Sequence, residues 1–157
     1  MNENLNIYQK LLASYQPEQP LTSRKNISTK ENGTRYTAVV TPPRDTVIFQ
    51  VDGYIIKNGN RCDKLILSID ASDSDKWHEY FIELKGHDVK HALKQLKSTL
   101  ELKLFEDKSV SKKYARIVGS SFPSNAGDPE FEKAKRDFKT QFKCELKKLK
   151  SNQPDRI

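Results

Sequence analysis

The stretch YFIELKGHDVKHALKQL, residues 80–96, decides the fold and raises the question of function. Up to Gly86 it alternates apolar residues with Glu83 and Lys85, which is typical of a strand end. After Gly86 the apolar residues recur at the spacing of one helix face: Val89, Ala92, Leu93, Leu96 and Leu100. The two opposite charges at the end of this strand form either a solvated ion pair at a sheet edge or part of an active site.

Two further strands are expected before this one. The segment TVIFQVDGYII, residues 46–56, is rich in β-branched and aromatic residues, and Asn58-Gly59 follows it. Because Asn-Gly favours the type I′ turn of a hairpin, CDKLILSID, residues 62–70, is predicted to return antiparallel. The polar insert ASDSDKW then leads into the strand HEYFIELK, residues 78–85. The three strands form a predicted meander.

The rest of the chain is expected to add two helices and one strand. Residues 4–15 carry apolar side chains at helical spacing, whereas residues 16–36 are predicted to form a polar connector, and Pro42-Pro43 a second break. Residues 114–122 are predicted to form a short apolar strand. A last helix is expected from Pro129 to about Leu149, with this buried seam: Phe131, Ala134, Phe138, Phe142, Leu146 and Leu149.

The predicted fold is therefore a single α/β domain in the order helix, three-strand meander, helix, strand, helix, with a mixed sheet flanked by helices. Residues 1–45 would hold the N-terminal helix and polar connector. Residues 46–151 would form the core with a basic C-terminal helix, and residues 152–157 a tail. A chain of 157 residues is long enough for one domain with its own hydrophobic core.

Composition favours a soluble protein with a polyanionic partner. The net charge is +7 and the pI is about 9.3, values that favour nucleic acid as a partner. No apolar run is long enough for a membrane span, and the N-terminus lacks a signal peptide. Cys62 and Cys144 show no metal-type spacing. We therefore expect a cytoplasmic, reduced protein with no membrane partner, in which the glycosylation sequons at Asn26 and Asn32 are chance matches.

The end of the 78–85 strand carries the candidate chemistry. Alternation places Glu83 and Lys85 on one face of the strand, and Asp63 lies near the start of the preceding strand. If these strands are antiparallel, the two carboxylates can converge. Two carboxylates suit Mg²⁺, which usually takes one or two protein carboxylates together with water and phosphate.

These residues resemble the PD-(D/E)-x-K nuclease superfamily, which has the restriction endonuclease-like or Holliday junction resolvase-like fold. The resemblance covers about residues 46–122. It rests on the segment CDKLIL, the strand YFIELKG and the helix that carries ALKQL. It implies a Mg²⁺- or Mn²⁺-dependent endonuclease of the restriction, repair or defence type, with DNA as the expected substrate. Cys62 precedes Asp63 at the position where the family's motif has a proline.

The resemblance also implies roles for individual residues. Asp63 and Glu83 would bind the metal with the main-chain carbonyl of Leu84, and Lys85 would be the catalytic lysine. Gln95 resembles a glutamine that some members direct toward the site. Asp52 is an alternative first metal ligand, and the sequence leaves that choice open.

Simpler interpretations stand beside these hypotheses. Glu83 and Lys85 can form a structural ion pair, and Asp63 can close a turn. His87 and His91 have no further Cys or His at a zinc-binding spacing and are expected to cap or border the helix. The last helix carries basic residues that can form a solvated face or a phosphate-binding stripe: Lys139, Lys143, Lys147 and Lys150. The alternatives to a nuclease are a non-catalytic nucleic-acid-binding domain of the same fold and a protein-interaction subunit. The oligomeric state, a homodimer included, stays open.

Overall fold

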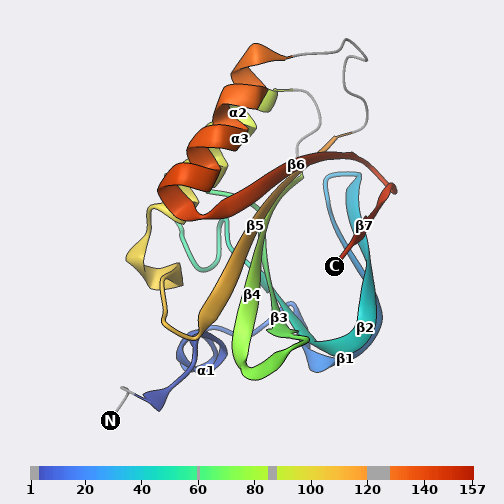
Figure 1. Ribbon diagram of the computed structural model, residues 1–157, viewed down its shortest axis with the longest axis vertical. Coiled ribbons are helices and arrows are strands. Elements are labelled where there is room, and N and C mark those ends of the chain that lie inside the picture. The colour runs from blue at the N-terminus through green and yellow to red at the C-terminus, as the bar shows by residue number, and fades with distance from the viewer. Residues whose placement is uncertain (1–3, 60, 85–87, 120–127) are drawn as a thin grey trace.

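The computed structural model describes residues 4–59, 61–84, 88–119 and 128–157. In this part the chain forms a single α/β domain with a seven-stranded mixed sheet and three α-helices (Figure 1). The helices are α1 Ile7–Leu12, α2 Val89–Leu100 and α3 Pro129–Phe142, with a short 3₁₀ turn at Lys103–Phe105. The strands are β1 Gln19–Glu31, β2 Thr34–Gln50, β3 Lys64–Asp70, β4 Asp73–Leu84, β5 Val110–Gly119, β6 Cys144–Lys150 and β7 Pro154–Arg156.

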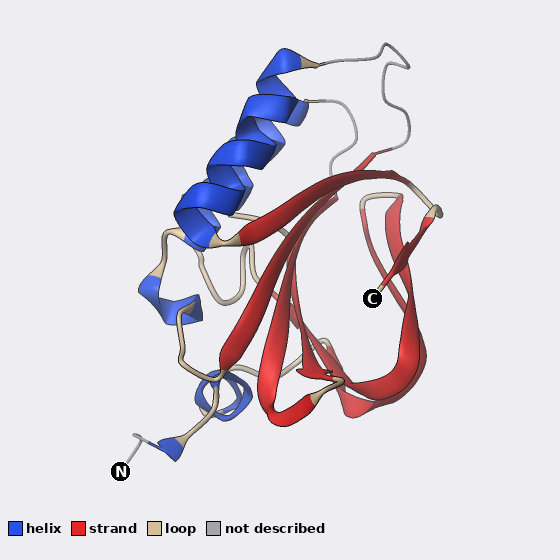
Figure 2. Cartoon of the chain, in the orientation of Figure 1, coloured by secondary structure: helices blue, strands red, loops and turns tan. Residues whose placement is uncertain are grey.

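The sheet has the order β1-β2-β3-β4-β5-β6, and β7 pairs with β2. The strands from β1 to β4 are antiparallel neighbours, as the meander prediction requires for β2, β3 and β4. Strand β5 runs parallel to β4 after α2, and β6 runs parallel to β5 after α3. Both helices lie on the same side of the sheet (Figure 2), because crossovers of one hand between parallel strands deliver them there.

The two faces of the sheet bury separate apolar clusters, which β4 illustrates. Phe81 belongs to the cluster beneath the helices, together with Leu96 of α2 and Phe138 of α3. Ile82 and Leu84 belong to the cluster on the other face. The predicted alternation of side chains along this strand is therefore confirmed.

The helix after the decisive strand is also confirmed. Asp88 is the N-cap of α2, and its Oδ1 accepts a hydrogen bond from the His91 amide at 3.0 Å. The apolar seam is buried from Ala92 to Leu100, with Leu96 fully inaccessible, whereas Val89 is only partly buried. The N-terminal helix is also present, but it is shorter than residues 4–15 because Asn6 and Gln9 cap it reciprocally at its start.

The prediction of a polar connector at residues 16–36 was wrong. Strand β1 and the start of β2 occupy this segment, and Asn32-Gly33 forms the two-residue hairpin turn between them. Both turn residues have positive φ, 48° and 84°, as a type I′ turn requires. The predicted turn at Asn58-Gly59 instead lies within a longer loop between β2 and β3, where only Gly59 of the pair has positive φ.

The break expected at Pro42-Pro43 does not end the strand. Strand β2 runs through both prolines, which lie where the register with β1 jumps from Arg24↔Arg44 to Asn26↔Val39. Such an irregularity tolerates proline because no ladder hydrogen bond is required of its nitrogen. The segment 152–157, expected to be a tail, contains β7, which pairs with β2.

The prediction of one helix from Pro129 to about Leu149 was also wrong. Helix α3 ends at its C-cap Lys143, which has the left-handed φ of 54°, and β6 begins at Cys144. Leu146 then lies in the cluster beneath the helices and Leu149 in the opposite cluster. If both leucines lay on one helix seam, they would belong to the same apolar cluster.

Candidate metal site and basic groove

The candidate site begins where β3 starts and β4 ends. Lys64 pairs with Ile82, and the Asp63 amide donates a hydrogen bond of 3.0 Å to the Ile82 carbonyl. Continuing this register by one residue sets Asp63 opposite Glu83. The structure therefore brings together the two carboxylate residues that the sequence singled out.

Both side chains lie inside the protein, on the face that the helices cover. Asp63 is 4% exposed and Glu83 is fully inaccessible. Burial raises the pKa of the Cys62 thiol far above its usual value, and the nearby charges of Glu83 and Asp63 raise it further. Both carboxylates are thus close to the same buried thiol, which stays protonated at neutral pH.

The backbone of β4 holds one of these carboxylates in place. The Leu84 amide donates a hydrogen bond of 2.8 Å to Oδ2 of Asp63. This bond connects the Asp63 side chain, at the start of β3, to Leu84, the last residue of β4. Lys85 is the next residue in the sequence. Lys85, the predicted catalytic lysine, and His87 lie outside the described residues.

Helix α2 fixes the segment that precedes Asp63. The amide of Cys62 donates to Oγ1 of Thr99 at 2.9 Å, and Nε2 of Gln95 donates to the Arg61 carbonyl at 3.2 Å. Gln95 is 3% exposed, and its Oε1 has no hydrogen-bond partner in the described part of the chain. Gln95 therefore contacts the backbone two residues before Asp63 and offers a buried acceptor. Thr99, which bonds to both Cys62 and the Gln95 carbonyl, was not expected from the sequence.

The donor set suits a hard divalent cation. Asp63 and Glu83 provide the one or two protein carboxylates that Mg²⁺ usually takes. Within residues 4–59, 61–84, 88–119 and 128–157, no cluster of three or more His, Cys, Asp or Glu side chains could hold a metal. Asp52, the alternative first ligand, lies in the loop after β2, where its bridge is to Ile56 and not to β4.

A third buried carboxylate, Glu79, was missed by the sequence reasoning. It shares the helix-covered face of β4 with Glu83, is fully inaccessible, and has no hydrogen-bond partner within the described residues. Its pKa is raised to about 8, mainly by burial; Lys113 opposes the rise, and Asp107 and Glu106 contribute to it. The signal was available in the sequence, because Glu79 and Glu83 are four residues apart in an alternating strand.

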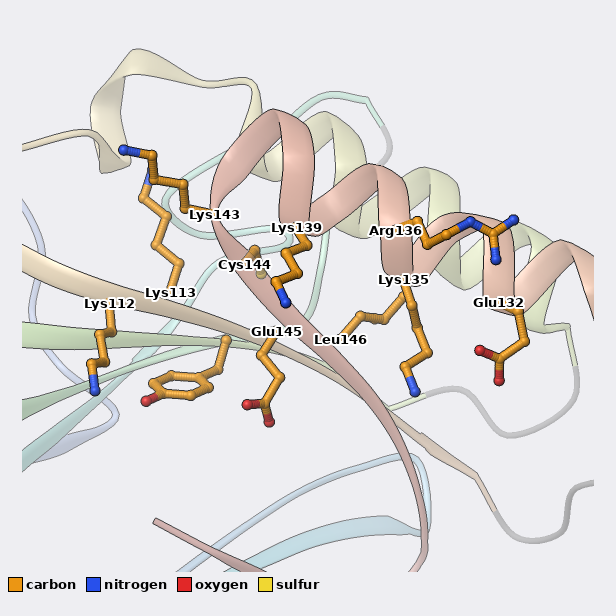
Figure 3. Close-up of a pocket in the computed structure, with 11 residues that line it drawn as sticks. Lys112, Lys113, Glu132, Lys135, Arg136, Lys139, Lys143, Cys144, Glu145 and Leu146 are labelled. Atoms are coloured by element: carbon orange, nitrogen blue, oxygen red, sulfur yellow. The ribbon is translucent and has the colours of Figure 1, made fainter.

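The basic residues of the C-terminal part do not form the predicted helical stripe. Lys139 lies on α3 and Lys143 is its C-cap, whereas Lys147 and Lys150 lie on β6. Lys139 and Lys143 instead line a groove of about 710 Å³ between α3, β5 and β6 (Figure 3). We call this the basic groove, and its charged lining is Lys112, Lys113, Lys135, Arg136, Lys139, Lys143, Glu132 and Glu145.

Neither a protein-family model, nor a curated protein, nor a solved structure matches this chain. None of the helices in the described part is long and apolar enough to cross a membrane.

Proposed function

We propose that this protein is a metal-dependent nuclease that hydrolyses phosphodiester bonds of nucleic acid, with DNA as the expected substrate. The observation that carries the proposal is the pairing of Asp63 and Glu83 at adjacent strand ends, both buried beside Cys62. Two carboxylates at adjacent strand ends match the one or two protein carboxylates that Mg²⁺ usually takes together with water and phosphate.

The order of the elements supports the same proposal. Helix α1, the β2–β3–β4 meander, α2 and β5 follow one another in the order expected for the PD-(D/E)-x-K core. Glu83 lies on β4, and Asp63 immediately precedes β3. The chain departs from the expected order by adding β1 before the meander and β6 and β7 after the core.

Each residue has a defined task in the proposed site. Asp63 and Glu83 would hold Mg²⁺ or Mn²⁺, with the Leu84 carbonyl as a further ligand. When bound, the metal ion would polarise the phosphodiester and lower the pKa of its water. The Leu84 amide fixes the Asp63 carboxylate, and Gln95 fixes the Arg61 backbone that leads to it. Lys85 would orient the attacking water and offset the charge that develops on the phosphate.

A second candidate function is nucleic-acid binding without cleavage. The basic groove favours this function, because its lining contains six Lys and Arg side chains and two carboxylates. Phosphate contacts of this kind give affinity without sequence information and need no catalytic site. The two candidates differ only in turnover.

The deciding experiment is cleavage of plasmid, single-stranded and branched DNA by the purified protein with Mn²⁺. We expect Glu83→Gln and Asp63→Asn to lower the rate by at least about a hundredfold. Lys85→Ala should lose turnover to a similar extent and retain DNA binding. Glu79→Gln is the matched control, since it makes the same replacement at an equally buried position on the same face of β4. Cleavage that persists at the wild-type rate in Glu83→Gln would exclude the proposed site, and no cleavage by the wild type would favour the second candidate.

A further inference from the structure

A second pocket lies on the sheet face opposite the helices. It has a volume of about 450 Å³ and lies between the bend of β2 and strands β4 to β6. Figure 2 shows how β1, β2 and β7 curve around until they stand across from β5 and β6 on this face. We call it the concave pocket. The residues that matter most for it are Arg44, His78, Lys112, Tyr114 and Lys147.

Two buried nitrogen atoms of this lining have no hydrogen-bond partner in the described part of the chain. They are Nε of Arg44 and Nδ1 of His78, and each residue is only 9% exposed. The remaining bonds of Arg44 run from Nη1 to the carbonyls of Thr41 and Pro42, at 3.1 Å each. A buried donor without an acceptor, such as Nε of Arg44, is unfavourable, so an acceptor from a ligand would be favoured here.

The orientation of His78 is fixed by Asp70. Nε2 of the ring lies 3.1 Å from Oδ2 of Asp70, and that carboxylate also accepts bonds from Ser72 and Ser111. A carboxylate held in this way favours a proton on Nε2, which leaves Nδ1 available to a ligand. Burial lowers the pKa of the His78 ring and the contact with Asp70 opposes this, so the negative charge of a bound phosphate would be needed to favour the protonated ring, in which Nδ1 is a donor.

The charges around the pocket favour an anion. Five Lys or Arg side chains line it, against the two carboxylates of Asp70 and Glu145. Arg116 is already engaged, since its Nε donates to Asp155 at 2.7 Å. Lys112, Lys147 and Arg156 also line the pocket, and Nζ of Lys147 lies 3.9 Å from Oδ1 of Asp155. Its aromatic wall is the stacked pair Tyr80 and Tyr114, with ring centroids 4.6 Å apart.

We propose that the concave pocket binds a terminal phosphate monoester, carried by a free nucleotide or by the end of a nucleic-acid strand. Arg44 and protonated His78 would donate to its oxygen atoms, and Lys112 and Lys147 would offset its second negative charge. Because the two unpartnered nitrogens are buried, the anionic group has to enter end-on, which a terminal phosphate can do and an internal diester cannot. This site is on the opposite face from Asp63 and Glu83, so it does not depend on the proposed nuclease activity.

The test is NMR of the histidine rings, of which the chain has three. The full chain, without metal, is titrated with inorganic phosphate, adenosine monophosphate, and one oligonucleotide with a 5′-phosphate or a 5′-hydroxyl end. We expect the His78 ring signals to move with adenosine monophosphate, with the 5′-phosphorylated oligonucleotide, or with both. Whichever of the two acts identifies the source of the phosphate. Equal shifts with both oligonucleotide ends, or no His78 shift with any probe, would overturn the proposal.

Variants separate a built site from general charge attraction. Arg44→Gln should weaken binding of the active probe by about tenfold or more. Lys147→Gln, nearer the surface, should weaken it by about threefold and keeps the test valid if Arg44→Gln does not fold. Lys143→Gln removes a cation from the basic groove and not from the concave pocket, so it should leave binding unchanged. Equal weakening by Lys147→Gln and Lys143→Gln would contradict a specific site.

Discussion

Glu79 and Glu83 lie on the same face of β4 and are equally inaccessible to solvent, yet their neighbours differ. Glu79 lies in the middle of the strand, paired in register with Lys113 of β5. Glu83 lies at the strand end, where the register sets Asp63 opposite it. The first is a single carboxyl that burial drives toward its neutral form. The second belongs to a pair that suits a cation.

The comparison teaches that burial of a carboxylate alone does not indicate a catalytic site. A second acid on the neighbouring strand, held by a backbone amide, is what distinguishes Glu83 from Glu79. The surroundings also differ in charge, because Lys113 beside Glu79 lines the basic groove. We therefore expect the region around Glu79 to contribute to binding of nucleic acid, and the end of β4 to contribute to its cleavage.

The largest expected effect is the pH dependence of stability that Glu79 confers. Its pKa in the folded protein is about 8, against an ordinary value of 4.5. Between these values the folded state retains a proton that the unfolded state has lost, so the free energy of unfolding falls as pH rises. The shift corresponds to roughly 5 kcal/mol in total.

Replacing Glu79 by glutamine, which mimics the protonated acid, should remove this slope. Urea unfolding of both proteins at pH 5, 6, 7 and 8 gives the difference between their free energies of unfolding. Contributions from other titrating groups, such as His78, cancel in this difference. The variant should gain stability relative to the wild type at each step. A difference that stays constant over this range would show that Glu79 does not titrate as its surroundings imply.

A smaller effect is expected from the basic groove. Each phosphate contact that is lost should lower the log–log salt slope of duplex binding by about 0.9. Lys139→Gln and Lys143→Gln should each reduce the slope on a duplex with 5′-hydroxyl ends. Lys147→Gln is the control, because Lys147 lines the concave pocket on the other face. An unchanged slope in Lys139→Gln and Lys143→Gln would leave the groove as a solvated surface.

The sequence predicted the part of the fold that has strong periodicity. Strands β3 to β5 and helix α2 are buried on one or both faces, so their apolar residues repeat clearly. The adjacency of Asp63 and Glu83 followed from that pattern, since antiparallel pairing alone brings the strand ends together. Lys85 lies outside the described residues, and its role remains a prediction.

The errors have physical causes that particular residues illustrate. Strand β1 is an edge strand in which only Ile27 and Thr29 are buried, so its sequence is polar and lacks a strand signal. At the other end, the spacing of Phe142, Leu146 and Leu149 fits a helix, but it does not exclude a strand that buries Leu146 on one face and Leu149 on the other. The left-handed conformation of Lys143 decides between them, and lysine gives no local indication of it.

The most direct test of the acid pair is Mn²⁺ binding, measured as the loss of the free Mn²⁺ signal in electron paramagnetic resonance. Wild type and Glu79→Gln should bind Mn²⁺ with Kd values within about twofold, because Glu79 has no second acid opposite it in the register. Glu83→Gln should bind at least about tenfold more weakly, because it removes a direct ligand. Binding by Glu83→Gln with the wild-type Kd would contradict the assignment of Asp63 and Glu83 as the metal site.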